Sequence, residues 1–187
     1  TLYSGRALEF DGVTDYVENA SFTGHQSSVG TISCWAKIGT IAGSGYHFIM
    51  GVGGNSTATK ERNIVIDAAN DKLMSVSHSS NPTTSLVLTT GKWYHFVLTW
   101  NGVSSLMYAD GVLEAYADSE ASLATPEGTK VRLGTASYTL ASYFDGQISN
   151  AQVWDKVWSL TDVQYAYTHP ERLITDNSAV TSGTTIS

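Results

Sequence analysis

Charge, cysteine and long apolar runs are all scarce in this chain of 187 residues. Only 14% of the residues are charged, and the 10 basic residues are scattered singly, so the sequence has no basic stripe of the kind that binds nucleic acid. The single cysteine, Cys34, excludes an internal disulfide framework, and its apolar surroundings in "TISCWAKI" predict a buried, unreactive thiol. No apolar run is long enough to cross a membrane, so we expect no membrane insertion.

The residues that are plentiful are typical of an all-β extracellular domain. Hydrophobic residues make up 42% of the chain and aromatic residues 11%, and there are 17 glycines. A chain of this length fits one domain with a sizeable core. We expect the chain, which begins at Thr1, to be a mature form or an excised piece of a longer protein.

Strand patterns dominate the sequence. Short β-branched or aromatic runs bounded by turn residues predict strands at 46–52, 62–68, 71–78, 84–89, 92–100, 103–109 and 112–117. Asn101-Gly102 and Asp110-Gly111 predict two-residue hairpin turns, which would make the last three of these strands a meander. A strand every ten residues or so predicts a sandwich or a barrel. Because 92–100 is apolar on both alternating faces, we expect it to be a central strand covered on both sides.

One short helix is predicted near the C-terminus, over 159–167. Thr161 is the expected N-cap, with Gln164 three residues later in the spacing of a capping box, and His169-Pro170 is expected to end the helix. Beyond it, residues 171–187 are rich in Ser and Thr and lack periodicity. We therefore predict a domain over 1–170 and a linker or extended tail over 171–187.

The tripeptide Phe-Asp-Gly occurs twice, at 10–12 and at 144–146. The sequences that follow the two copies differ, so an internal repeat is a poor explanation. We interpret the two copies as parts of the first and last strands of one sandwich. Phe10 and Phe144 would then anchor the strands in the core, and each Asp-Gly would form a turn at the edge.

Four segments resemble a known family, in the order in which that family has them. They are "ALEFDGVTDYVENA", "GTISCWAKI", "GKWYHFVLTWNGVSSLMYADGVLEA" and "YFDGQISNAQVWDKVWSLTDVQ". Together they resemble the laminin-G-like domains of the concanavalin A-like lectin/glucanase superfamily, over about Leu2 to Pro170. The resemblance implies an all-β, antiparallel jelly-roll sandwich of two sheets. It also implies a binding module attached to a larger secreted or surface protein.

The sequence favours a protein without catalytic activity. A β-glucanase of the superfamily would carry Glu-x-Asp-x-x-Glu, whose carboxylates flank the glycosidic bond about 5 Å apart. Here the match Glu9-Phe-Asp11 ends in Thr14, which is not a carboxylate, and Gly12 interrupts the strand. The five histidines lack zinc-ligand spacing, and His95 is predicted to be a core residue of its strand. A glycoside hydrolase remains a remote alternative.

Calcium is the one cofactor for which the residues make a case. Asp11 and Asp15 lie in one turn, and Asp145 would join them if the terminal strands pair, which would give three carboxylates to a cation that prefers oxygen ligands. The resemblance implies calcium at a rim of the sandwich. However, the family commonly has Ile-Asp-Glu where this chain has Ile148-Ser149-Asn150. The alternative is that Asp11 and Asp145 only shape Asp-Gly turns.

A sugar site would need an aromatic platform with polar side chains around it. Tyr138 and Tyr143 flank the predicted loop "SYTLASY", and Asn55, Arg62 and Asn81 lie on other loops expected at one end of the sandwich. Trp35 is either a second platform on an open sheet face or a packed core residue.

The predicted function is a non-catalytic module that binds a carbohydrate or a surface protein. It would be part of a larger extracellular or virion-surface protein and be joined to further domains of the same polypeptide. The alternative is a structural or decoration module of a phage-like particle.

Overall fold

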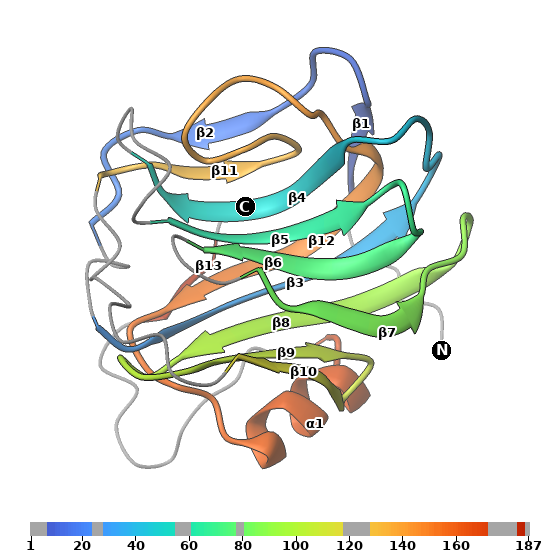
Figure 1. The fold of residues 1–187 in the computed structure, drawn as a ribbon. Coiled ribbons are helices and arrows are strands. Elements are labelled where there is room, and N and C mark those ends of the chain that lie inside the picture. The colour runs from blue at the N-terminus through green and yellow to red at the C-terminus, as the bar shows by residue number, and fades with distance from the viewer. Residues whose placement is uncertain are drawn as a thin grey trace.

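The computed structural model describes residues 7–23, 28–54, 61–77, 81–117, 128–171 and 183–185, which form two packed antiparallel sheets and one short helix (Figure 1). One sheet has seven strands. Its main path is β1 (Leu8–Asp11), β12 (Asp145–Trp154), β3 (Gly30–Ile38), β8 (Trp93–Trp100), β9 (Ser105–Ala109) and β10 (Val112–Ala117), and β13 (Gly183–Thr185) also pairs with β12. The predicted jelly-roll sandwich is confirmed.

The second sheet has six strands and lies in front of the first in Figure 1. Its order is β2 (Val17–Asn19), β11 (Val131–Leu133), β4 (Tyr46–Gly53), β5 (Glu61–Asp67), β6 (Lys72–Ser77) and β7 (Thr83–Val87). Every strand predicted over 46–117 is present, with ends that differ by a few residues. The helix α1 spans Leu160–Thr168.

The main core lies between the two sheets because alternate residues of each strand point inward. On β3 these residues are Ile32, Cys34, Ala36 and Ile38, all of them buried. Burial raises the pKa of the Cys34 thiol to about 12, since the charged thiolate would lose its hydration there. The prediction of an unreactive cysteine is confirmed.

Strand β8 is buried on both faces, as predicted. Tyr94, Phe96, Leu98 and Trp100 belong to the core between the sheets. Val97, on the other face, packs with α1 in a second apolar cluster that contains Tyr108, Trp154, Trp158, Val163 and Ala166. The outer face of the seven-stranded sheet is therefore partly covered by the helix.

The helix also covers Trp35, whose environment the sequence left open, and His95. Trp35 is stacked on Tyr167 of α1, with ring centroids 5.8 Å apart, so it is packed and not an open platform. His95 lies beside Trp35 and is buried, as predicted, and burial lowers the pKa of its imidazole to about 3.

Only one of the two predicted hairpin turns is a two-residue turn. Asp110 and Gly111 have φ values of 49° and 81° and join β9 directly to β10. The prediction for Asn101-Gly102 is wrong, because Trp100 pairs with Ser105 and leaves a four-residue loop. Asn101 Oδ1 accepts hydrogen bonds from the backbone N–H groups of Val103 and Ser104, and these bonds stabilise the longer loop.

The helix is present, but its N-cap is Ser159 and not Thr161. Ser159 Oγ accepts from the backbone N–H of Asp162, and the Asp162 carboxylate accepts from the backbone N–H of Ser159. This reciprocal capping box uses Asp162 in place of Gln164, so the N-cap lies two residues before the predicted one. It ends at His169, as predicted.

The two Phe-Asp-Gly segments come together through strand pairing. Strand β1 pairs with β12, and the register places Asp11 opposite Asp145. Phe10 and Phe144 are both buried in the core, with ring centroids 6.4 Å apart. The two Phe residues anchor these strands in the core, as interpreted. β1 is the first strand of the sandwich, but β12 is not the last, because β13 follows it in the chain.

Within the predicted tail, the described residues Gly183–Thr185 form β13, which pairs with Gln152, Val153 and Trp154 of β12. Among the described residues, no helix has the length and apolar character needed to span a membrane.

Candidate ligand-binding face

The outer face of the six-stranded sheet carries a row of side chains that crosses four strands. The strand register places Glu18 of β2 opposite Arg132 of β11. Arg132 is opposite Gly51 of β4, and Gly51 is opposite Asn63 of β5. Residues paired in this way lie on one face of a sheet with Cβ atoms about 5 Å apart. The row thus holds a carboxylate, a guanidinium and an amide, with a gap at Gly51.

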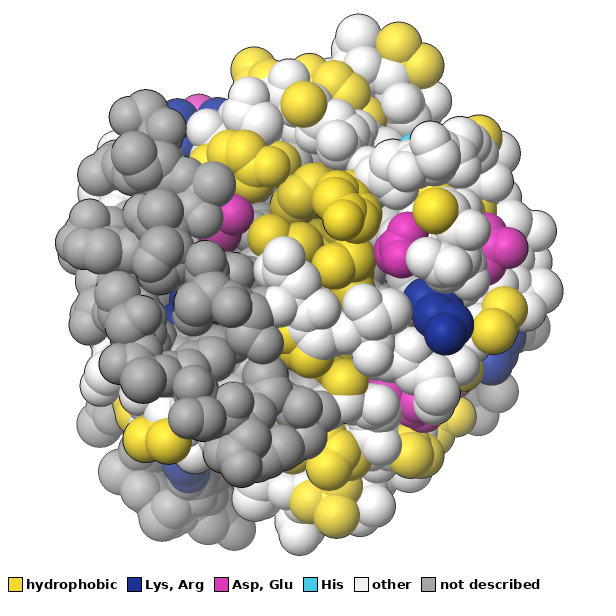
Figure 2. Space-filling model, in the orientation of Figure 1, with side chains coloured by type: hydrophobic (Ala, Val, Ile, Leu, Met, Phe, Trp, Pro, Cys, Tyr) yellow, Lys and Arg dark blue, Asp and Glu magenta, His cyan; other side chains and the backbone are white. Residues whose placement is uncertain are grey.

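Beside this polar row the same face is apolar. Phe48, Val65, Met74 and Ala136 are buried together, and Val76 and Tyr138 pack against them while partly exposed. The ring of Tyr138 meets that of Phe48 edge-on, with centroids 6.1 Å apart. Figure 2 shows hydrophobic side chains gathered in the middle of this face, over β4 to β6. The face therefore offers a fixed aromatic ring next to polar groups.

Tyr138 belongs to the covering loop, residues 134–144, which joins β11 to β12 and lies against this face. Two glycines make room for the loop: Gly51 lies in β4, and Gly54 follows the end of this strand. A Cβ atom at Gly51 would lie 3.0 Å from the Ser137 Cβ atom, and one at Gly54 would lie 2.5 Å from the Ser137 carbonyl oxygen. Ser137 also donates its backbone N–H to Asn63 Oδ1 over 3.3 Å. These contacts fix the position of the neighbouring Tyr138.

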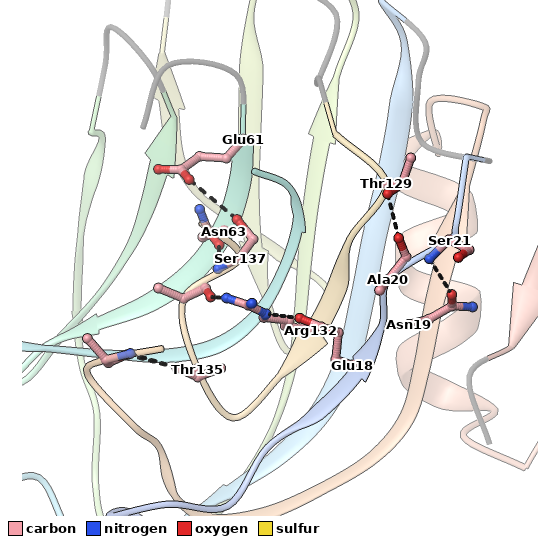
Figure 3. A network of polar contacts seen from close by, with 12 residues as sticks. Glu18, Asn19, Ala20, Ser21, Glu61, Asn63, Thr129, Arg132, Thr135 and Ser137 are labelled. Carbon is pink, nitrogen blue, oxygen red and sulfur yellow. Dashed lines mark hydrogen bonds and ion pairs between the residues drawn. The ribbon is translucent and has the colours of Figure 1, made fainter. Parts of the chain in front are cut away.

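Arg132 ties the covering loop to the edge of the sheet. Its Nε donates to Glu18 Oε2 over 2.6 Å, and its Nη1 donates to the carbonyl oxygen of Ala136 over 2.8 Å (Figure 3). The Arg132 side chain is 5% exposed, whereas that of Glu18 is 26% exposed. Arg132 therefore acts as a support, and Glu18 is the member of the pair that a ligand can reach.

Glu61 lies at the inner end of this polar network and is fully buried. Ser137 Oγ donates to Glu61 Oε2 over 3.4 Å (Figure 3), and Glu61 Oε1 has no hydrogen-bond partner. Burial raises the pKa of this carboxyl group to about 7, because the carboxylate would be poorly solvated. A protonated, uncharged Glu61 suits this position best.

The sequence matches a laminin G family model over residues 11–164. The family is described as the concanavalin A-like lectin/glucanases superfamily. The chain belongs to this superfamily. No curated protein sequence matches this superfamily member.

Solved structures share the fold of this superfamily at low sequence identity. A heptameric SAP-like pentraxin from Limulus polyphemus is 18% identical, with a TM-score of 0.65 over 85% of this chain and 80% of that one. The CBM40 of an IT-sialidase from Ruminococcus gnavus, bound to α2,6-sialyllactose, is 16% identical, with a TM-score of 0.63 over 87% and 98%. A sialidase from Trypanosoma rangeli is 14% identical with a TM-score of 0.69, and the match spans 29% of its length.

The structure of this superfamily member brings only part of the predicted sugar site together. Tyr138 and Tyr143 lie on the covering loop, and the carbonyl oxygen of Tyr143 is 2.8 Å from His47 Nδ1. Asn81 is exposed just before β7, and Asn55 lies outside the described residues. The expected loop position of Arg62 is wrong, because Arg62 is in β5.

Arg62 faces the core. Its side chain is 1% exposed, and its guanidinium carbon lies 5.9 Å from the centroid of the Trp100 ring. In this structure Arg62 therefore has no surface to offer a ligand.

Sequence reasoning missed the polar residues that hold the face together. Glu18 and Arg132 are 114 positions apart, and nothing local links them. The one available signal is the alternation in "VRL", where a charged residue stands between two inward-pointing ones. Such a residue must lie on an outer sheet face, but its partner depends on the strand order.

The residues predicted to bind calcium are close together, but Asp11 and Asp15 already accept hydrogen bonds within their own turn. Asp11 Oδ1 accepts from the backbone N–H groups of Val13, Thr14 and Asp15, and these bonds hold the pKa of Asp11 well below its usual range. Asp15 Oδ2 accepts from the backbone N–H of Asp11. Within the described residues, no group of three His, Cys, Asp or Glu side chains is placed to hold a metal ion. The turn alternative therefore holds for Asp11. The predicted turn at Asp145-Gly146 is wrong, because both residues are paired within the sheet at the start of β12, and calcium stays a prediction.

Proposed function

We propose that this domain is a non-catalytic carbohydrate-binding module. It would bind an uncharged glycan on the outer face of the six-stranded sheet, between Tyr138 and Glu18. The observation that carries the proposal is the partly exposed Tyr138 ring, held by the covering loop on the same face of the sheet as a carboxylate that Arg132 positions. Sugar-binding sites use an apolar or aromatic surface with a few fixed polar groups, and this face supplies both.

The solved structures support a glycan as the ligand. The Ruminococcus gnavus CBM40 domains, which match over nearly their whole length, are described as bound to α2,3- and α2,6-sialyllactose. The charges on this face nevertheless favour an uncharged glycan. Arg132 is paired with Glu18, the reachable group is a carboxylate, and the chain has a net charge of -7. An acidic sugar would meet repulsion here.

The two carboxyl groups on this face support binding without hydrolysis. A glycosidase needs two carboxyl groups that flank an accessible bond, one of them able to donate a proton. Glu61 is fully buried, and Glu18 is held in an ion pair with Arg132. We therefore propose a module that works in a larger extracellular or virion-surface protein, where further domains would use the bound glycan.

A glycan array that contains matched sialylated and unsialylated glycans tests this function. Wild type, Tyr138→Ala and Tyr165→Ala are compared, each with calcium and with a chelator. Tyr165 is a matched control because it is an exposed tyrosine of α1, on the other side of the sandwich. We expect wild type and Tyr165→Ala to bind unsialylated glycans, and Tyr138→Ala to bind about tenfold or more weakly. Equal binding by Tyr138→Ala, or silence of the wild type across the array, would overturn the proposal.

A further inference from the structure

The turn that follows β2 contains a sequence pattern that the proposed binding face does not use. Asn19, Ala20 and Ser21 form an Asn-x-Ser triplet whose middle residue is not proline. This triplet is the acceptor sequence for the attachment of an oligosaccharide to an asparagine amide, a modification of surface segments in exported proteins. A second triplet of this kind begins at Asn55, outside the described residues. Asn81-Pro82-Thr83 does not qualify, because its middle residue is proline.

The triplet lies at an exposed edge of the sandwich. Strand β2 is the outermost strand of the six-stranded sheet, and Asn19 is its last residue. All three residues of the triplet are exposed. Because successive residues of a strand point to opposite faces, Asn19 lies on the other side of β2 from Glu18. A group attached to Asn19 therefore extends into solvent away from the face that carries Glu18 and Tyr138.

The turn holds the Asn19 side chain in one orientation. Asn19 Oδ1 accepts a hydrogen bond from the backbone N–H of Ser21 over 3.0 Å (Figure 3). This Asx turn engages the amide oxygen and leaves the amide nitrogen, Nδ2, on the other side of the group. Among the described residues, none forms a hydrogen bond with Asn19 Nδ2 or Ser21 Oγ. Both groups of the acceptor triplet are therefore accessible to a modifying enzyme.

Contacts with the segment before β11 fix this turn to the sandwich. Thr129 Oγ1 donates to the carbonyl oxygen of Ala20 (Figure 3), and the backbone N–H of Phe22 donates to the carbonyl oxygen of Thr129 over 2.8 Å. The Phe22 side chain is partly buried and packs against the main core. These contacts leave the side chains of the triplet exposed while their backbone is held in place. The acceptor asparagine is thus presented on an ordered part of the fold.

We propose that Asn19 is the attachment site of an N-linked oligosaccharide. The donor is an oligosaccharide joined to a lipid through pyrophosphate, and the catalyst is an oligosaccharyltransferase of the export route. Asn19 Nδ2 forms a bond to C1 of the first sugar, the bond between C1 and the pyrophosphate oxygen breaks, and the lipid pyrophosphate leaves with the bonding electrons. One amide proton passes from Nδ2 to a base of the transferase. The proposal rests on the extracellular setting proposed above and not on glycan binding at Tyr138.

Peptide mass spectrometry of the whole chain, secreted from cells that make the lipid-linked donor, tests the site. Release of N-linked oligosaccharides by an amidase in ¹⁸O water leaves a labelled Asp at each position that carried one. The tryptic peptide between Arg6 and Lys37 contains Asn19 as its only asparagine, so a label in this peptide identifies the site. We expect the label at Asn19 and none at Asn81. Ser21→Ala should abolish the label, because it removes the hydroxyl of the triplet, and Ser21→Thr should retain it.

The other outcomes decide against the site. An unlabelled Asn19 in the secreted wild type, or a label that persists in Ser21→Ala, would overturn the proposal. Asn19→Asp keeps a side-chain oxygen for the Ser21 N–H and removes the acceptor nitrogen, so it replaces Ser21→Ala if that variant disturbs the turn.

The glycan array separates this proposal from the proposed function. Array binding by a chain whose Asn19 is unlabelled overturns the attachment site alone. A silent array with a labelled Asn19 overturns the Tyr138 site alone. Wild type and Asn19→Asp should bind the array equally, because Asn19 lies on the other side of β2 from Glu18.

Discussion

On the six-stranded sheet the outer face is covered by a loop held by hydrogen bonds, whereas on the seven-stranded sheet it is covered in part by a helix held by apolar packing. The covering loop is fastened by Arg132 to Ala136 and by Ser137 to Asn63. The helix is fastened through Val163 and Ala166, which pack with Trp154 and Trp158.

The two covers should respond differently to the loss of a side chain and to a change of pH. Apolar packing depends on shape and is insensitive to pH, and its loss leaves a cavity. A polar cover depends on pairs, and removing one partner leaves the other buried and unsatisfied. It also titrates where it contains a buried acid such as Glu61. We therefore expect the two faces to fail by different routes.

The largest effect is expected on the helix side, from Trp158→Ala. Trp158 is 2% exposed and packs edge-on against Trp154, with ring centroids 5.8 Å apart. Removing the indole from a packed site should lower the free energy of unfolding by about 3–5 kcal/mol. Chemical denaturation measures the change, with Leu160→Ala as the control because Leu160 is exposed at the start of the same helix. A loss below about 1 kcal/mol would show that the helix is not held by this cluster.

A smaller effect, but one that depends on pH, is expected from Glu61. Its pKa is raised from an ordinary value of 4.5 to about 7, so the folded state binds more protons than the unfolded state between these values. The contribution of Glu61 to stability should therefore fall as the pH rises from 4.5 to 7, by up to about 3 kcal/mol, and stay level above that range. In Glu61→Gln this part of the pH dependence should disappear.

The measurement is the free energy of unfolding of wild type and Glu61→Gln at several pH values between 4 and 8. Glu114→Gln is the matched control, since Glu114 lies on β10 and is partly exposed. Parallel curves for wild type and Glu61→Gln would contradict the prediction. On the helix side, His95 gives a slope of the opposite sign, because burial lowers its pKa from 6.5 to about 3 and the folded state then binds fewer protons than the unfolded state between these values. Wild type and Glu61→Gln share this slope, so it cancels in the difference between their curves.

The comparison also explains which features could be predicted from the sequence. Two features follow from local patterns. An apolar residue before a predicted edge turn indicates the packing of Phe10 and Phe144. Two residues that accept positive φ indicate the turn at Asp110-Gly111. The helix is present as predicted, but its reciprocal cap is formed by Ser159 and Asp162 and not by Thr161 and Gln164. The ends of the strands and the helix could therefore be inferred from short stretches of sequence.

The polar face could not be inferred in this way. The partner of Arg132 is set by the order β2-β11-β4, which brings Glu18 across from a distant part of the chain. Tyr138 could be proposed as a ligand-binding residue because it is an aromatic residue in a predicted loop. Arg62 was misplaced because a charged residue at the start of a strand looks exposed, although its stem and guanidinium extend over Trp100.

The smallest change in stability, and the sharpest test of the comparison, is expected from Arg132→Ala. The substitution leaves the Glu18 carboxylate and the Ala136 carbonyl oxygen without this donor, and we expect a loss of about 2 kcal/mol, reduced by the access of water to Glu18. The covering loop should detach while both sheets stay folded. Glycan binding at Tyr138 should therefore weaken far more than the stability does. Lys130→Ala, just before β11, is the control for loss of a positive charge. A Tyr138 site that survives Arg132→Ala intact would show that the other hydrogen bonds of the loop, such as Ser137 to Asn63 and Phe48 to Ser142, hold it without Arg132.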